Sequence, residues 1–459
     1  MVKRMRRAWL SPRTWVRRVV LWGGALCVGI AAVLFAMASE HANDSFHKLL
    51  ALSPWFPFLV TPLGLAAVAW VAQRVFPGSE GSGIPQTIAA LNMTDEVARN
   101  RVLSLKIVLG KILLTVLAIF SGASVGREGP TVQVGASIMH GFGQIGSFRR
   151  FEIDRGLILA GGAAGVAAAF NTPLAGVVFA IEEMSRSFES RTSGTVLTGV
   201  IIAGVLSLAV LGDYVYFGRT SASLGTDQSW IAVLACGAVG GLAGGIFSQL
   251  LIMSSRSIPG TVGKIRRERP VLFAALCGLL LAMIGFASGG TTFGTGYLEA
   301  KSILEGSDYL PETFGVLKLF ATLVSYVSGI PGGVFAPSLA VGAGLGLNLA
   351  EYLPYAPVGA VIVLGMVAYF AGVVQAPITA FVIVMEMTDN HDMVLPLMAT
   401  ALIATAISRL VCHDALYRVL AQRFLPATAA RSQGPRTQAP KTEAPKTEAP
   451  RTQEPPPKS

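Results

Sequence analysis

Long stretches without a charged residue constrain this chain more than any other feature. A helix that crosses a bilayer needs about 20 consecutive apolar residues, and most of these stretches reach that length. They are continuously apolar, whereas the strands of a membrane barrel alternate in polarity. The chain is therefore predicted to be an all-α polytopic membrane protein with more than about ten helices. The charge-free stretches span residues 19–38, 49–73, 156–181, 192–212, 228–255, 271–298, 319–350, 352–385 and 393–408.

The composition agrees with lipid as the main solvent. Charged residues make up 14% of the chain, against about 25% in soluble domains. This excludes a collagen, a disordered chain, a disulfide scaffold and an ordinary soluble enzyme. The cysteines lie far apart and show no metal or redox spacing, so no metal site is expected. They are Cys27, Cys236, Cys277 and Cys412.

Positive charge is concentrated near the ends of the chain and in one loop. Residues 1–18 hold basic side chains and no acid, so the positive-inside rule places this end in the cytoplasm. The basic loop 264–269 and the tail follow the same rule. Nucleic-acid binding is the alternative explanation, but orientation in the membrane is simpler. A signal peptide cleaved near residues 36–38 is also conceivable, yet the apolar stretch 19–38 is long enough to remain as a span.

Two blocks of sequence recur in the same order, which indicates an internal repeat. Residues 130–137 align with residues 337–344, and residues 170–182 align with residues 374–386. Many transporters consist of two such halves with the substrate site at their interface. The alignment alone leaves parallel and inverted repeats open.

The repeat suggests a division of the chain into three parts. Residues 1–18 are expected to form a basic cytoplasmic segment, and residues 19–425 the membrane domain. The first repeat covers about 50–212 and the second about 230–412. Residues 426–459 are rich in Pro, Lys and Thr, and such a segment cannot bury enough apolar surface to order itself.

Pro130 and Pro337 each follow a Gly-rich turn and precede an apolar stretch. Proline is well tolerated in the first turn of a helix, so each block predicts a helix that begins inside the membrane. The unpaired N–H groups and the positive dipole end of a helix N-terminus form an anion site. Two such ends, one from each half, could converge on one anion. The alternative is a pair of Pro-kinked packing helices.

Four motifs together carry a resemblance to a known family. They are Gly81-Ser82-Gly83-Ile84-Pro85, Gly126-Arg127-Glu128-Gly129-Pro130, Gly333-Val334-Phe335-Ala336-Pro337 and Ala415-Leu416-Tyr417. In this order, with an Ile-Glu-Glu-Met run at Ile181–Met184, they resemble the CLC family of chloride channels and chloride/proton antiporters over about residues 15–425. The first three motifs are similar to the selectivity-filter segments of that family.

The resemblance implies a CLC-type transmembrane domain with two inverted repeats and interrupted helices. It implies transport of chloride and protons without a cofactor, in a homodimer with one pore per subunit. Without cytoplasmic nucleotide-binding domains, the chain is similar to compact prokaryotic members. The expected location is the inner (plasma) membrane, with both termini in the cytoplasm and no nucleic-acid partner.

The resemblance also assigns roles to the chloride ligands. The Ser82 hydroxyl, the backbone N–H groups of Val334 and Phe335, and the Tyr417 hydroxyl match positions that bind the central chloride. Without the family, Ser82 reads as a helix cap and Tyr417 as an interface anchor. Serine at position 82 favours chloride over nitrate.

Two acids match the proton-handling positions. Glu128 corresponds to the external gate, because a carboxylate among helix N-termini competes with chloride until it is protonated. A salt bridge to Arg127 is the alternative, although Arg127 is better explained as positive potential at the outer entrance. Glu183 corresponds to the internal proton-transfer acid, and a solvated helix end is its alternative. Glu182 is expected to line the aqueous approach and Glu386 to be structural.

The leading hypothesis is a chloride/proton antiporter, and the alternative is a passive chloride channel of the same fold. A fluoride exchanger is disfavoured by the Ser82 and Glu128 motifs. A membrane-embedded enzyme would need a nucleophile–base pair or a metal cluster, and none is evident in the sequence. One departure from the family is Gln86-Thr87-Ile88, where many members carry acids, which predicts that Lys106 lacks an acidic partner.

Overall fold

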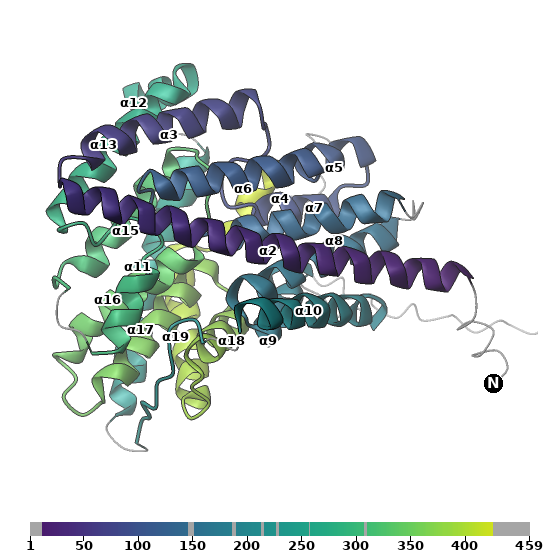
Figure 1. The fold of residues 1–459 in the computed structure, drawn as a ribbon. Helices are drawn as coiled ribbons and strands as arrows, with labels where there is room; N and C mark the ends of the chain where they lie inside the picture. The colour runs from purple at the N-terminus through teal and green to yellow at the C-terminus, as the bar shows by residue number, and fades with distance from the viewer. Residues whose placement is uncertain are drawn as a thin grey trace, which may run out of the picture. The chain divides into compact units, whose positions relative to one another are not determined.

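The structure of the chain is a computed structural model that describes residues 12–145, 151–185, 190–212, 215–225, 229–256, 258–306 and 310–425. Residues 1–11 of the predicted basic segment and the whole predicted tail lie outside these residues. The described part is built from helices (Figure 1), in the order α2 (Pro12–Leu52), α3 (Pro57–Arg74), α4 (Ile84–Asn92), α5 (Glu96–Val102), α6 (Leu105–Phe120), α7 (Glu128–Ile145), α8 (Phe151–Phe170), α9 (Pro173–Phe179), the π-helix η1 (Ala180–Ser185), α10 (Ser190–Leu211), α11 (Trp230–Arg256), α12 (Gly260–Glu268), α13 (Pro270–Ala287), α14 (Tyr297–Leu304), α15 (Phe314–Val327), α16 (Phe335–Ala350), α17 (Val358–Val374), α18 (Pro377–Thr388), α19 (Val394–Val411) and α20 (Leu416–Gln422).

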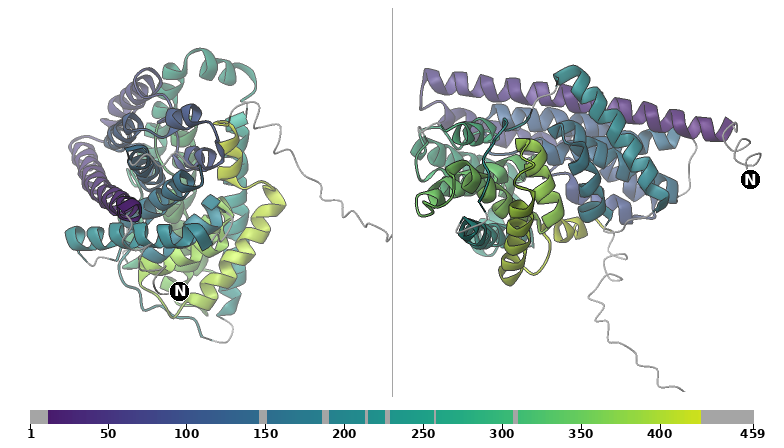
Figure 2. Two further views of the ribbon diagram at one scale, coloured as in Figure 1. Left: turned by 90° about the vertical axis from the view of Figure 1, so that its right-hand side faces the viewer. Right: turned by 90° about the horizontal axis from the view of Figure 1, so that it is seen from below.

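The prediction of an all-α polytopic membrane protein is confirmed. Within the described ranges, extended pairing is limited to two isolated bridges, Gly81 with Pro331 and Gly126 with Gly333. Helix α2 lies along the flank of the first half, against α6, α7, α8 and α10 (Figure 2). Seven helical segments among the described residues are long and apolar enough to cross a membrane, namely Trp15–Leu52, Glu96–Phe120, Ile153–Phe170, Gly194–Leu211, Trp230–Arg256, Pro270–Ala287 and Val394–Val411.

Reciprocal contacts relate the two halves by a pseudo-two-fold axis. The N–H of Gly126 donates to the carbonyl of Gly333 at 2.8 Å, and the N–H of Gly333 donates back to Gly126 at 2.7 Å. These glycines occupy equivalent places in the two repeats. Equivalent residues that contact each other in this reciprocal way are the signature of two-fold symmetry.

Helices α9 and α18 show that the repeats are inverted. The carboxylate of Glu182, just after α9, accepts hydrogen bonds from the N–H groups of Ile378 (3.1 Å) and Thr379 (2.6 Å) at the start of α18. The carboxylate of Glu386, near the end of α18, accepts them from Leu174 (3.1 Å) and Ala175 (2.7 Å) at the start of α9. Helices α9 and α18, which are equivalent in the two repeats, therefore run antiparallel. The pseudo-two-fold axis is thus perpendicular to them, as an inverted repeat requires. Both acids cap helix N-termini, so Glu386 is structural, as expected.

A buried lysine holds the turn that precedes α4. Lys111, on α6, is fully buried, and its Nζ donates to the carbonyls of Ser79 and Gly81, each at 2.7 Å. A charge at membrane depth is costly unless polar groups surround it. The sequence singled out Lys106 instead, and that residue is exposed.

Lys318 plays the same part in the second half. It lies fully buried on α15 and donates to the carbonyls of Thr292 (3.0 Å) and Gly294 (2.9 Å). The buried acid Glu299 lies within electrostatic reach. Lys318 thus fixes the turn before α14.

Replacing Lys318 with methionine is expected to destabilise the fold. The change leaves buried carbonyls without donors and Glu299 without its positive neighbour, and each unpaired carbonyl costs about 1–3 kcal/mol. The apparent melting temperature in detergent should fall by roughly 5 °C or more. Lys301→Met is the matched control, because Lys301 is partly exposed and its 3.8 Å pair with Glu305 is weak. Equal melting temperatures for the two variants would contradict this account of Lys318.

Candidate functional site

The predicted anion site lies where four helices begin. Helix α7 begins at Glu128 and α16 at Phe335, with Val334 as its N-cap. Ser82 lies in the turn before α4, and Tyr417 lies in the first turn of α20. The rings of Phe335 and Tyr417 are 6.0 Å apart between centroids. Gly126 and Gly333, two residues before the starts of α7 and α16, exchange backbone hydrogen bonds, so residues from both halves of the chain meet here.

Glycines allow these segments to approach closely. A Cβ atom at Gly129 would overlap Oγ of Ser82, and one at Gly126 would overlap Oε2 of Glu128. A Cβ at Gly333 would lie 3.0 Å from the backbone nitrogen of Gly129. These contacts explain why glycine occupies all three motif positions, since any side chain would fill the space between the helix N-termini.

Three buried polar side chains at this place make no hydrogen bond of ordinary geometry. They are the Ser82 hydroxyl, the Tyr417 hydroxyl and both carboxylate oxygens of Glu128. Each of these residues is at most 1% exposed. An unmade hydrogen bond of a buried group costs free energy, and buried polar groups are normally paired. The Ser82 and Tyr417 hydroxyls lie close enough to act on each other electrostatically, so both adjoin one place, where each could donate a hydrogen bond to an ion.

Replacing Gly129 with alanine is expected to displace Ser82 and slow chloride flux, on the order of tenfold if Ser82 moves by about 1 Å. Chloride release from liposomes measures the effect. Gly141→Ala is the matched control, because Gly141 lies on the same helix and a Cβ there meets nothing within 4 Å. Wild-type flux in Gly129→Ala would show that the close approach to Ser82 does not matter.

Arg127 pairs with an acid on another helix. Its Nη1 donates to Oε1 of Glu40, on α2, at 2.9 Å. The pairing partner in the structure is thus Glu40, whereas the alternative drawn from the sequence was Glu128. The Tyr216 hydroxyl and the Ala336 amide are donors close to the Glu128 carboxylate: they stabilise its charge, although neither meets ordinary hydrogen-bond geometry.

Glu183 lies on a distorted helix. The segment Ala180–Ser185 is a π-helix, and such irregular turns are frequent at functional sites. Glu183 is buried, with 4% of its surface exposed, and it acts electrostatically on Tyr417. Phe335 packs against both Tyr417 and Phe179, the latter at 5.9 Å between centroids. Phe179 precedes Glu183 by four residues, about one helical turn.

The remaining predicted filter residues surround the same place. All are buried except Gly81, which is partly exposed. Gly83 has a positive φ of 98°, which permits the turn into α4. The set comprises Gly81, Gly83, Ile84, Pro85, Gly126, Arg127, Gly129, Pro130, Gly333, Ala336 and Pro337. Within the described ranges, no cluster of three or more His, Cys, Asp or Glu residues could hold a metal ion.

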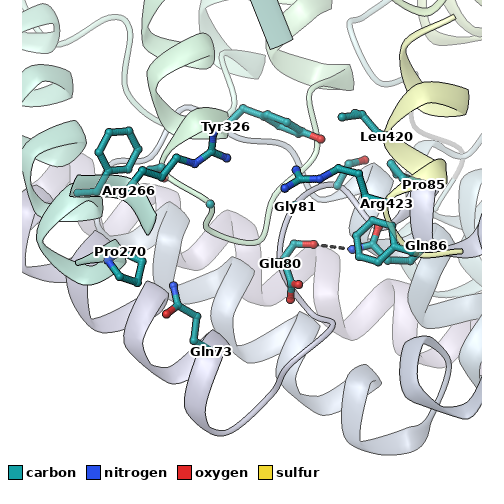
Figure 3. Close-up of a pocket in the computed structure, with 15 residues that line it drawn as sticks. Gln73, Glu80, Gly81, Pro85, Gln86, Arg266, Pro270, Tyr326, Leu420 and Arg423 are labelled. Carbon is teal, nitrogen blue, oxygen red and sulfur yellow. Dashed lines mark hydrogen bonds between the residues drawn. The ribbon is translucent and has the colours of Figure 1, made fainter. Parts of the chain in front are cut away.

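A cavity of about 270 Å³ has Ser82 among its lining residues, and Figure 3 shows how the labelled lining residues surround it. Its lining includes Gly81 and Ser82 from the first half, Tyr326 from the second, and the arginines Arg266 and Arg423. In the sequence, Arg266 served only as one of the basic residues that orient the loop 264–269 in the membrane. That Arg266 lines the same cavity as Ser82 could be seen only in the folded structure.

Comparison with known proteins identifies the family. A family model described as voltage gated chloride channel matches residues 63–409. The H(+)/Cl(-) exchange transporter ClcA of Yersinia pestis is 32% identical over 427 residues, which is 87% of this chain and 87% of that protein. This chain belongs to the CLC family. The same transporter of Citrobacter koseri matches this CLC chain at 32% identity over 437 residues, 89% of the chain and 90% of the relative.

Solved structures share the CLC fold. A slow cyanobacterial Cl⁻/H⁺ antiporter superposes with a TM-score of 0.77 at 25% identity, covering 92% of this chain and 99% of that one. A CLC-type fluoride/proton antiporter superposes with a TM-score of 0.75 at 20% identity, covering 89% and 99%. The likeness to the second structure concerns the fold alone.

Proposed function

We propose that this CLC protein exchanges chloride for protons across the membrane. The observation that carries the proposal is the meeting of the buried Ser82, Tyr417 and Glu128 side chains at the N-termini of α7 and α16. The relatives named above as H(+)/Cl(-) exchange transporters and the Cl⁻/H⁺ antiporter structure support the same activity.

In this proposal, chloride binds at the helix N-termini. The backbone N–H groups of Val334 and Phe335 face it, because the first N–H groups of a helix have no partner within the helix. The hydroxyls of Ser82 and Tyr417 each donate one hydrogen bond. The positive ends of the helix dipoles stabilise the ion.

Glu128 is the external gate in this proposal. Its carboxylate is an anion that competes with chloride for the same donors. Protonation removes that charge, and chloride then takes the place of the carboxylate. Arg127, held by Glu40, supplies positive potential at the outer entrance.

Protons pass between Glu183 and Glu128, while chloride reaches Ser82 through the cavity beside it. The two routes share Glu128 and diverge toward the inner side. Glu183 suits the role of internal proton-transfer acid because it is buried and lies about one helical turn after Phe179, which packs against Phe335.

The setting proposed for this activity is the inner (plasma) membrane, with both termini in the cytoplasm. The protein acts as a homodimer with one pore per subunit and uses neither a cofactor nor enzymatic chemistry. The division into residues 1–18, 19–425 and 426–459 belongs to the same proposal.

The alternative is a passive chloride channel of the same fold. Chloride release from liposomes, recorded together with the external pH, separates the two. An antiporter takes up protons in a fixed ratio to the chloride released. Chloride release without proton uptake would favour the channel.

A further inference from the structure

The cavity beside Ser82 is larger and more positively charged than a path for chloride requires. Two arginines from separate elements, Arg266 on α12 and Arg423 just after α20, approach it from opposite sides (Figure 3). Its volume of about 270 Å³ is far larger than one chloride requires. The Tyr326 hydroxyl lies within electrostatic reach of both guanidinium groups.

Arg266 is held in place for binding. One of its Nη1 hydrogens is donated to the carbonyl of Ser254, at the end of α11. The guanidinium carbon lies 6.0 Å from the centroid of the Phe273 ring, which also lines the cavity. A guanidinium fixed in this way loses little side-chain entropy when it binds a ligand.

Arg266 and Arg423 place two positive charges at this cavity. Burial, and then repulsion from Arg423, lowers the pKa of Arg266 from its ordinary value. The group remains charged, because an arginine pKa lies far above neutral pH. An anion between the two guanidinium groups would relieve the repulsion and restore hydrogen bonds lost on desolvation.

The rest of the lining does not cancel the positive charge. Glu80 is the acid of the lining, and its Oε2 accepts a hydrogen bond from the N–H of Gly78 at 2.8 Å. Gln86 is neutral, and its side chain bonds to the carbonyl of Glu80 (2.5 Å) and the N–H of Gly83 (3.1 Å). Two arginines and one acid leave the lining with a net positive charge.

The chemistry of a guanidinium pair favours an oxyanion. The planar fork of N–H donors matches the oxygens of phosphate in pairs. Spherical chloride gains nothing from this geometry. A tetrahedral oxyanion also has enough oxygens to engage both arginines and the Tyr326 hydroxyl at once.

We propose that Arg266 and Arg423 form a second anion site that binds inorganic phosphate and thereby blocks the approach to Ser82. Occupied, the site closes the chloride route from the inner side, so phosphate acts as an inhibitor of transport. The binding part of this inference stands alone, and the inhibition part rests on the proposed chloride transport.

Binding is measured by the broadening of the ³¹P resonance of inorganic phosphate on adding the full-length protein in lipid-free detergent. Wild type should broaden the signal, and Arg266→Gln and Arg423→Gln should each weaken binding by about tenfold or more, as expected for losing a charge-assisted hydrogen bond. Glu80→Gln should tighten binding because it removes the negative charge of the lining. Arg267→Gln is the matched control, since Arg267 lies on the same helix, is exposed and does not line the cavity.

Inhibition is measured as chloride flux from liposomes with phosphate on both sides at constant ionic strength. Each variant is compared with its own flux without phosphate, and wild type and Arg267→Gln should be inhibited far more than either cavity variant. The inference is overturned if wild type does not broaden the phosphate signal, or if Arg267→Gln weakens binding as much as the cavity variants do. It is also overturned if a phosphomonoester lipid added to the liposomes inhibits chloride flux and inorganic phosphate does not. A wild-type protein that binds phosphate but moves no chloride would refute the transport proposal and leave the site standing.

Discussion

Replacing Glu128 with glutamine is expected to abolish proton transport while chloride continues to flow. Glutamine is close in shape to a protonated glutamate, so it neither carries a proton nor competes with chloride for the donors at the start of α7 and α16. Chloride flux in wild type should rise as the pH falls, because protonation removes the competing charge. In Glu128→Gln the same flux should not change with pH.

The experiment uses chloride flux and proton flux in the same liposomes, across a series of pH values. Glu40→Gln is the control, because Glu40 is an acid of the same region that pairs with Arg127 but lies outside the anion site. Coupling should persist in Glu40→Gln. Proton transport that survives in Glu128→Gln, or chloride flux that keeps its pH dependence, would contradict the gate assigned to Glu128.

Replacing Glu183 with glutamine is also expected to abolish proton transport, but for a different reason than Glu128→Gln. In the proposal Glu183 delivers protons and does not bind chloride, so the change should block delivery of protons to Glu128 and leave the gate intact. Chloride flux should therefore continue and keep its dependence on pH. This retained dependence distinguishes the internal acid from the gate.

Glu182→Gln is the matched control for this variant. Glu182 is the adjacent acid, and its carboxylate caps the start of α18. The amide oxygen of glutamine can still accept a hydrogen bond there, so coupling should remain. Full coupling in Glu183→Gln would remove this residue from the proton route.

The sequence predicted the site elements well because their signals are local. Pro130 and Pro337, each after a Gly-rich turn, predicted two helices that begin inside the membrane, and α7 and α16 begin at Glu128 and Phe335. A proline in the first turn and glycines before it determine such a boundary without help from distant residues. The roles assigned to Glu128 and Glu183 stay predictions that the variants above test.

Contacts between the halves could not be predicted in the same way. Glu182 was expected to line the aqueous approach, yet its carboxylate caps α18 almost two hundred residues later in the chain. Nothing in the residues around Glu182 specifies that partner. The sequence analysis singled out Lys106 and not Lys111, because the residues around a lysine in an apolar stretch do not show which carbonyls will surround it in the fold.

Arg266 is a similar case. In the sequence its charge indicates only the orientation of a loop, and the folded structure shows that it lines the same cavity as Ser82.

The most direct test of the account is whether a chloride gradient alone moves protons uphill. Liposomes containing the purified protein are given a chloride gradient and equal pH on both sides, with potassium and valinomycin holding the membrane potential at zero. The account predicts that protons move opposite to chloride and build a pH difference, and that Glu128→Gln abolishes this pH difference. Chloride movement with no change of pH in the wild-type protein would contradict proton-coupled exchange.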